Sequence, residues 1–181
     1  MAGQKELVLP LQSFPTTQPA ILLTASFNEK YACGDIYSGS NLVVVPLTGG
    51  TIESVAGFEP KLKFNVNSGA DFLTVDADKK HGRVNVKGVA TDDEGLSITF
   101  IADGIVELND ITTAIAFGAP DAKPSPFGFA VEMFKFETGH AKYKSLEGML
   151  FVGSQRFTPP KGETIGVEVR LARVISGTGM E

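Results

Sequence analysis

Apolar and polar residues alternate along most of the chain with a period of two. Leu62, Phe64 and Val66 alternate with lysine and asparagine, and Val84 and Val86 alternate with arginine, asparagine and lysine. Because successive side chains of a β-strand point to opposite faces, this pattern predicts strands with two unlike faces. The candidate strands are 5–11, 20–28, 41–48, 57–66, 71–76, 82–91, 95–109, 127–136, 148–156 and 164–175.

Clusters of turn-forming residues separate these runs. Thr48-Gly49-Gly50, Asn67-Ser68-Gly69 and 92–95 each predict a turn. Helical periodicity is nearly absent, and only 140–148 is a candidate for a short helix. Nine or ten strands with short connections predict either an antiparallel β-barrel or a β-sandwich, and the pattern alone does not separate the two.

The chain length and composition are typical of one folded domain, here 1–181. The formal net charge is -5 and no polybasic run occurs, which argues against nucleic acid as the main partner. Cys33 is the only cysteine, so no internal disulfide can form. No apolar run approaches the roughly 18 residues that span a bilayer. We therefore expect a cytoplasmic protein without a membrane partner.

Several strands are apolar on both faces, as in Leu42-Val43-Val44-Val45 and in 127–136. In a closed barrel one such face lines the interior and the other meets a cover or a partner subunit. This pattern indicates a homo-oligomer, a ligand cavity, or both. A well-filled sandwich core is the simpler alternative.

A set of motifs in the chain resembles one known family. Val45-Pro46-Leu47-Thr48-Gly49-Gly50-Thr51-Ile52 and Gly69-Ala70-Asp71-Phe72 are similar to two of its segments. Thr91 to Gly95, Phe136-Glu137-Thr138-Gly139 with Tyr143, and Arg173-Val174 are similar to others. The chain is identified by these motifs, over about 20–175, as a member of the β-barrel family catalogued as domain of unknown function three-two-three-seven.

The resemblance implies an antiparallel β-barrel, which favours the barrel over the sandwich. Fungal relatives in natural-product pathways, of the phenalenone type, imply a cofactor-free cyclase of the isomerase or lyase class. The implied reaction is an intramolecular hydroalkoxylation, in which a phenol oxygen adds across a prenyl alkene of an aromatic polyketide. The chain departs from the family pattern at Asn41-Leu42-Val43, Lys87, Ala130-Val131 and Glu147, which is consistent with a pocket altered for a more apolar ligand.

Asp71 is the first candidate catalytic residue. It matches the family motif, and inside a barrel its carboxyl would be desolvated, which raises the pKa and keeps a proton available for a general acid. The alternative is that Asp71 caps the turn at 67–70 through backbone N–H groups.

Glu132 and Arg83 are the other candidate catalytic residues. Glu132 lies in an otherwise apolar run, where a carboxylate is either paired or functional. It would remove the phenol proton or orient the phenol, or else form an ion pair with Arg170 or Arg173. Arg83, if it faces inward, would hold a phenolate or carbonyl oxygen, and the alternative is a solvated outer face. Which carboxyl is the acid stays open.

The remaining candidates would contact an apolar aromatic substrate. Phenylalanine occurs 13 times, and most of these rings are expected to pack in a core, while a few would lie against a flat ligand. His81 and His140 lack the spacing of a metal site, so we expect neither metal nor cofactor. The candidate substrate-binding residues are Phe72, Lys87, Phe129, Tyr143 and Arg173.

Three functions are therefore compared. The first is a cofactor-free cyclase acting on a prenylated aromatic polyketide. The second is a non-catalytic carrier of small apolar ligands, and the third is an oligomeric scaffold with a filled barrel. A barrel packed solid with side chains would favour the scaffold, whereas a hollow with inward acidic groups would favour the enzyme.

Overall fold

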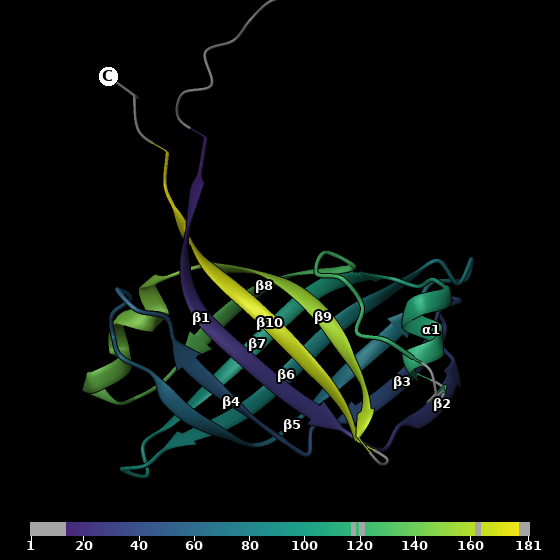
Figure 1. Ribbon diagram of the computed structural model, residues 1–181, viewed down its shortest axis with the longest axis horizontal. Coiled ribbons are helices and arrows are strands. Elements are labelled where there is room, and N and C mark those ends of the chain that lie inside the picture. Colours follow the sequence, from purple (N-terminus) through teal and green to yellow (C-terminus); the bar gives the residue numbers. More distant parts are fainter. Residues whose placement is uncertain (1–13, 117–118, 120–121, 162–163, 178–181) are drawn as a thin grey trace, which may run out of the picture.

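A computed structural model describes residues 14–116, 119, 122–161 and 164–177. Its strands form one antiparallel sheet, and eight of them close into a barrel in the order β5-β4-β1-β10-β9-β8-β7-β6, with β6 pairing back onto β5 (Figure 1). The barrel predicted from the sequence is thus confirmed. The strands are β1 Thr16–Phe27, β2 Tyr31–Asp35, β3 Asn41–Pro46, β4 Gly49–Ser54, β5 Lys63–Val75, β6 His81–Asp92, β7 Ser97–Glu107, β8 Ala130–Glu137, β9 Phe151–Lys161 and β10 Thr164–Ile175.

The longest strand of the sheet, β5, has two neighbours on one edge. Its first half pairs with β4, with Thr51 opposite Asn65, and its second half pairs with β3, with Asn41 opposite Val75. The β2–β3 hairpin therefore extends the wall beyond β4 at one end of the barrel. This extra wall bounds the mouth of the cavity described below.

The first residues of β1 and the last residues of β10 continue past the rim of the barrel as a two-stranded arm (Figure 1). The pairing runs to Thr16 opposite Ile175, with an irregularity between Pro19 and Ile21. Closer to the barrel wall β1 also pairs with β4, from Ile21 to Ser26. The arm thus begins where the second neighbour of β1 ends.

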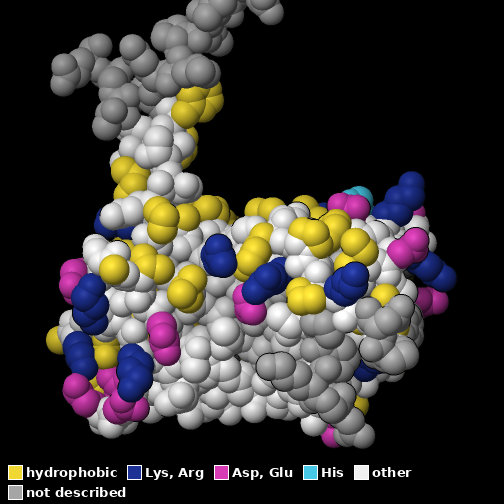
Figure 2. All heavy atoms as spheres, in the orientation of Figure 1, with side chains coloured by type: hydrophobic (Ala, Val, Ile, Leu, Met, Phe, Trp, Pro, Cys, Tyr) yellow, Lys and Arg dark blue, Asp and Glu magenta, His cyan; other side chains and the backbone are white. Residues whose placement is uncertain are grey.

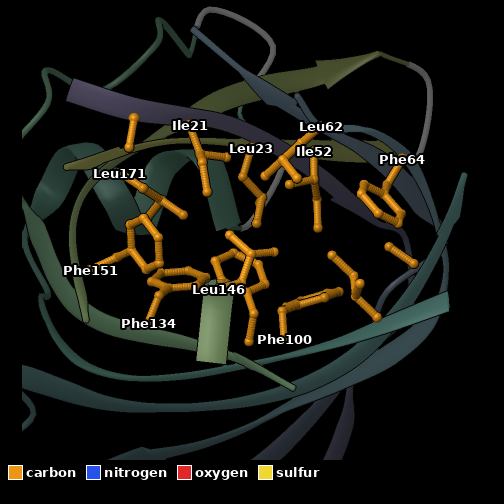
Figure 3. Packing of buried hydrophobic residues seen from close by; sticks show 14 of the residues in the cluster. Ile21, Leu23, Ile52, Leu62, Phe64, Phe100, Phe134, Leu146, Phe151 and Leu171 are labelled. Atoms are coloured by element: carbon orange, nitrogen blue, oxygen red, sulfur yellow. The ribbon is translucent and has the colours of Figure 1, made fainter. Parts of the chain in front are cut away.

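One end of the barrel is filled by a hydrophobic core (Figure 3). Phe136 and Phe151 pack edge to face with ring centroids 5.4 Å apart, and Phe58 meets Phe151 in the same way at 6.0 Å. The 3₁₀ helix η1 (Ala141–Gly148) adds the buried side chain of Leu146 to this core. The side chains stand inward because alternate positions of each strand face the interior.

The two short helices lie at opposite ends of the barrel (Figure 1). Helix η1 packs against β8 at the filled end, whereas α1 (Asp110–Ala116) packs against β9 near the β2–β3 hairpin. Asn109 begins α1 by accepting the backbone N–H groups of Ile111 and Thr112 at 3.0 and 3.1 Å, which is the usual work of an N-cap asparagine. No helix in the described ranges is long and apolar enough to cross a bilayer.

The outer surface of the barrel carries mixed side chains. On the face shown in Figure 2, hydrophobic side chains spread below the arm, and charged ones lie at both ends and also across the middle. Ile105 and Val131 are paired in register on β7 and β8 and are both exposed. The period-two pattern that the sequence shows in these strands is therefore the inside and outside of the barrel wall.

Several predicted boundaries differ from the structure. The turn expected at Asn67-Ser68-Gly69 is wrong: β5 runs through it with a register shift between Val66 and Ser68, because one extra residue in a strand is absorbed as a bulge. The prediction also missed β2, β4 and α1. The candidate strand 5–11 falls outside the described residues, while 164–175 is confirmed as β10.

Candidate functional site

The other end of the barrel is hollow. A cavity of about 110 Å³, here called the inner cavity, lies between the core and the open end. Its lining is almost entirely aliphatic and aromatic, and the polar side chains on it are Asp71, Glu132 and Gln155. No Lys, Arg or His is among the described residues that line it. The hypothesis of an oligomeric scaffold assumed a barrel filled with side chains, and this cavity does not favour it.

A wider space of about 1000 Å³, here called the mouth, continues from the inner cavity. The two share the side chains of Phe27, Val45, Leu73, Val106 and Phe157, which form a neck between them. The mouth is bounded by the β2–β3 hairpin and by Thr112, Thr113 and Ile115 of α1, and it carries charged residues of both signs. A ligand longer than the inner cavity has space to extend into this mouth.

Asp71 lies on β5 with its side chain in the inner cavity. Its Oδ1 accepts the backbone N–H of Asn85 on β6 at 2.9 Å. In the β5–β6 ladder Asp71 pairs with Val86, and the next pair is Thr74 with Arg83. Asn85 lies between these two pairs, and its backbone N–H is bound by the Asp71 carboxyl. Asp71 therefore does not cap its own turn, as the structural alternative supposed, but reaches across to the next strand.

Glu132 projects inward from β8, where the buried positions alternate with exposed ones. Its side chain is 3% exposed and lines the inner cavity. The ion pair with Arg170 or Arg173, considered as an alternative, does not form. Arg170 packs instead over the ring of Phe127, at 4.5 Å from its centroid. Among the described residues no hydrogen bond or ion pair holds the Glu132 carboxyl.

Two glycines flank Glu132 on the neighbouring strands. Gly104 on β7 and Gly153 on β9 are the register partners of Glu132 on either side. A Cβ on Gly104 would lie 2.5 Å from Cγ of Glu132, and a Cβ on Gly153 would lie 2.8 Å from a methyl of Leu171. Both distances are shorter than van der Waals contact. Gly104 thus leaves the space that the Glu132 side chain occupies, whereas the space at Gly153 is filled by Leu171, Val169 and Phe134.

The two carboxyls have pKa values on either side of neutrality. Burial raises the pKa of Asp71 to about 6, against the lowering effect of the hydrogen bond from Asn85. Burial, and to a smaller extent the negative charge of Asp71, together raise the pKa of Glu132 to about 8. Desolvation favours the neutral form of each carboxyl. Near pH 7 Asp71 is thus mostly ionised while Glu132 mostly keeps its proton.

The other charged candidates lie outside the cavity. Arg83 faces outward and forms an ion pair with Asp76, with Nη2 and Oδ2 2.6 Å apart. Lys87 is exposed on the same face of β6. Phe72, next to Asp71 in sequence, is 50% exposed because neighbouring residues of β5 point to opposite sides. The structure does not bring these three side chains to the inner cavity.

Tyr143 lies at the filled end rather than at the mouth. Its hydroxyl donates to Oδ2 of Asp92 at 2.6 Å, and its ring meets Phe64 at 4.8 Å between centroids. Phe129 immediately precedes β8, and Arg173 lies on the arm side of β10; neither lines the inner cavity or the mouth. Of the eight candidate site residues, the structure brings together Asp71 and Glu132.

Sequence reasoning missed Gln155. It lies on β9 opposite Ala130 and Val169, is 7% exposed, and lines the inner cavity. The signal was present in the strand itself, since Phe151, Gly153 and Gln155 share one face of β9. A polar residue on an inward face is the same feature that identified Glu132.

Near the rim, Asp76, Asp78 and His81 bring one potential ligand atom each to within 4.8 Å of one another. Asp76 is already engaged by Arg83, whose Nε and Nη2 both donate to it. Exposed acidic groups of this kind are common without a bound ion. We assign no metal to them.

The fold is shared with solved structures from bacteria and a fungus. A conserved protein of unknown function from Rhodopseudomonas palustris aligns with a TM-score of 0.72 at 19% identity, covering 90% of this chain and 99% of that one. A β-barrel-like protein from Acinetobacter baumannii gives 0.64 at 20% identity, with 91% and 99% covered. An enzyme from Penicillium herquei gives 0.52 at 17% identity, with 93% and 99% covered.

These identities establish the common fold alone. No curated protein matches the chain. The sequence model of a family described as protein of unknown function (DUF3237) matches residues 15–174, which is nearly all of the described barrel. The motifs that carried the resemblance lie within this match, and so do both inward carboxyls. The chain belongs to the DUF3237 family.

Proposed function

We propose that the protein is a cofactor-free cyclase that closes an oxygen ring on a prenylated aromatic polyketide. The observation that carries the proposal is the pair of carboxyls, Asp71 and Glu132, whose pKa values of about 6 and about 8 bracket neutrality in an apolar cavity. A base and an acid that coexist near the working pH are what proton-transfer catalysis needs. The presence of an enzyme among proteins of the same fold is consistent with it.

The roles follow from the protonation states. Ionised Asp71 takes the proton of the phenol, which breaks the O–H bond and leaves the electron pair on oxygen. Protonated Glu132 gives its proton to the terminal carbon of the alkene, where a C–H bond forms, and the phenol oxygen bonds to the adjacent carbon. The substrate is isomerised with no atom gained or lost, and a proton passing from Asp71 to Glu132 restores the starting state.

These roles reverse the first assignment from sequence, in which Asp71 was the acid. The hydrogen bond from Asn85 favours the ionised form of Asp71, and the charge of Asp71 favours the neutral form of Glu132. The backbone of Asn85 therefore supports the ionised form of Asp71, and ionised Asp71 in turn supports the protonated form of Glu132. Arg83, bound to Asp76 on the outside, has no part in this mechanism.

The cavity suits a flat hydrophobic substrate. Phe100, Phe134 and Phe157 lie among the aliphatic side chains of its wall, and aromatic rings pack well against a planar ligand. An electron-deficient carbon that develops during proton transfer is also stabilised near an aromatic face. The lining around the two carboxyls is almost entirely apolar, and an apolar surrounding strengthens their electrostatic effect on a bound substrate.

The experiment uses 2-(1,1-dimethylallyl)-1-naphthol as a probe, because protonation of its terminal alkene carbon followed by oxygen attack gives a five-membered ring. The purified full-length chain is incubated with it in D₂O at pD near 7, and the product is followed by chiral chromatography and mass spectrometry. We expect one enantiomer of the dihydronaphthofuran, with one deuterium in the new methyl group. Racemic product at the rate of the protein-free solution would contradict the proposal.

Matched variants locate the chemistry. Glu132→Gln and Asp71→Asn should each lower turnover by at least about 100-fold, the usual contribution of a positioned acid or base. Glu137→Gln, an exposed change on the same strand, should leave turnover as in the wild type. If the wild type and both variants bind the probe equally and none of them closes the ring, the protein is a carrier and not a cyclase.

A further inference from the structure

Gln155 is a buried amide on the wall of the inner cavity. Its side chain is 7% exposed, and none of the hydrogen bonds of the described residues involves its side-chain amide. No fully buried side-chain nitrogen or oxygen in the described chain lacks a partner. The amide atoms therefore reach the cavity space that they line.

The residues paired with Gln155 on the neighbouring strands have no polar side chain that could bind its amide. Its partners on the neighbouring strands are Ala130 and Val169, and the next inward residue of β9 is Gly153. A buried amide without a hydrogen bond destabilises a protein, because it has lost its water partners and gained none. A group that enters the cavity and bonds to the amide recovers this cost, whereas a pure hydrocarbon does not.

Glu132 and Gln155 lie diagonally on adjacent strands. Glu132 pairs with Gly153, two residues from Gln155, and diagonal positions are about 7–8 Å apart between backbones, within reach of long side chains. Asp71 lies on β5, four strands away around the ring of eight. A ligand between β5 and β9 thus meets a carboxylate on one side and an amide with a protonated carboxyl on the other.

We propose that Gln155 is a binding residue that selects ligands with a hydroxyl on an aromatic ring over the corresponding hydrocarbons. An amide both donates and accepts hydrogen bonds, and so does a phenolic hydroxyl. A site built to bond a hydroxyl rejects an analogue that lacks it, because its polar group is then left unpaired. The inference deepens the proposed function by naming the ligand feature that the cavity recognises.

The test compares 1-naphthol with naphthalene as ligands of the wild-type protein and of Gln155→Met, by fluorescence titration of the ligand at pH 7. Methionine has nearly the shape of glutamine but no amide. We expect the wild type to bind 1-naphthol at least about tenfold more tightly than naphthalene. Gln155→Met should lose about tenfold in affinity for 1-naphthol and bind naphthalene at least as well as the wild type.

Gln18→Met is the matched control, since Gln18 is exposed on the arm and far from the cavity lining in register. It should change neither affinity. Thermal unfolding without ligand gives a second readout: Gln155→Met should match or exceed the wild type in melting temperature, because an unpaired buried amide is removed. A clear fall in melting temperature would show that Gln155 has a structural role and would overturn the inference.

Two further results would also overturn it. In the first, the wild type binds naphthalene as tightly as 1-naphthol. In the second, Gln155→Met loses affinity for both ligands to the same extent. Neither result touches the acid–base pair, because ring closure in D₂O and its loss in Glu132→Gln are measured separately. Conversely, Gln155→Met could selectively lose affinity for 1-naphthol while the wild type fails to close the ring of the alkenyl probe. That result would support the inference about Gln155 and contradict the cyclase proposal.

Discussion

Replacing Glu132 with glutamine should remove a large part of the pH dependence of folding stability. The pKa of this carboxyl rises from 4.5 to about 8 on folding because the ionised form is desolvated and faces Asp71. The folded state therefore holds its proton more tightly than the unfolded state. Stability is unaffected below pH 4.5, falls as pH rises from 4.5 to about 8, and stays low above that.

The size of this effect follows from the shift. Each pKa unit corresponds to 1.36 kcal/mol, so the full rise in pKa corresponds to about 5 kcal/mol, of which about 4 kcal/mol is lost between pH 5 and pH 9 as an upper bound. Relaxation around the charge reduces this loss, and we expect about 2–4 kcal/mol. This is a large share of the 5–15 kcal/mol typical of a folded domain.

The assay is urea unfolding at pH 5, 7 and 9, followed by far-ultraviolet circular dichroism because the chain has no tryptophan. The advantage of Glu132→Gln over the wild type should grow by about 2–4 kcal/mol from pH 5 to pH 9. Glu137→Gln, on the exposed face of the same strand, should show a constant difference from the wild type. Growth of less than about 1 kcal/mol for Glu132→Gln would refute the reasoning.

Turnover of the alkenyl naphthol should follow a bell-shaped pH profile with a maximum near pH 7: it falls below about pH 6, where Asp71 gains a proton, and above about pH 8, where Glu132 loses one. A profile that rises steadily with pH would contradict this. Tyr143→Phe should cost about 1.5–3 kcal/mol in urea unfolding, because it leaves the buried Asp92 carboxylate without its 2.6 Å hydrogen bond; an unchanged midpoint would contradict this. Gly104→Ala should abolish turnover and lower the melting temperature, since the new Cβ would meet the Glu132 side chain and the backbone of β8; wild-type turnover would show that this side chain has room to move. Arg83→Met should change stability by less than about 1 kcal/mol and leave turnover intact, as expected for an exposed ion pair, and a large loss of turnover would return Arg83 to the mechanism.

The barrel was predictable because alternation is a strong local signal. Strands such as β10 carry it over their full length, and the bounds predicted for that strand match the structure. The elements that were missed carry little of it. β2 and β4 are short, and β4 begins with two glycines that resemble a turn, whereas their pairing with β3, β1 and β5 is decided by distant parts of the chain.

The same contrast holds for the site. Asp71 and Glu132 were identified because an acidic residue on an inward or motif-bearing strand position is unusual. Arg83 was named as a candidate although the alternation of β6 sets it with Asn85 and Lys87 on the polar face, opposite Val84 and Val86, and this polar face is the outer one. Gln155 was missed because a single uncharged amide gives a weaker signal than a carboxyl. Its importance depends on the cavity, which only the closed barrel creates.

The central claim is that Asp71 and Glu132 face one apolar cavity and hold different protonation states at neutral pH. A ¹³C NMR titration of side-chain carboxyls, with resonances assigned from Asp71→Asn and Glu132→Gln, measures this directly. The account predicts two coupled steps with apparent pKa values near 6 and near 8, and the upper step should move to lower pH when Asp71 is replaced. Two carboxyls that both complete their titration below pH 5 would contradict it.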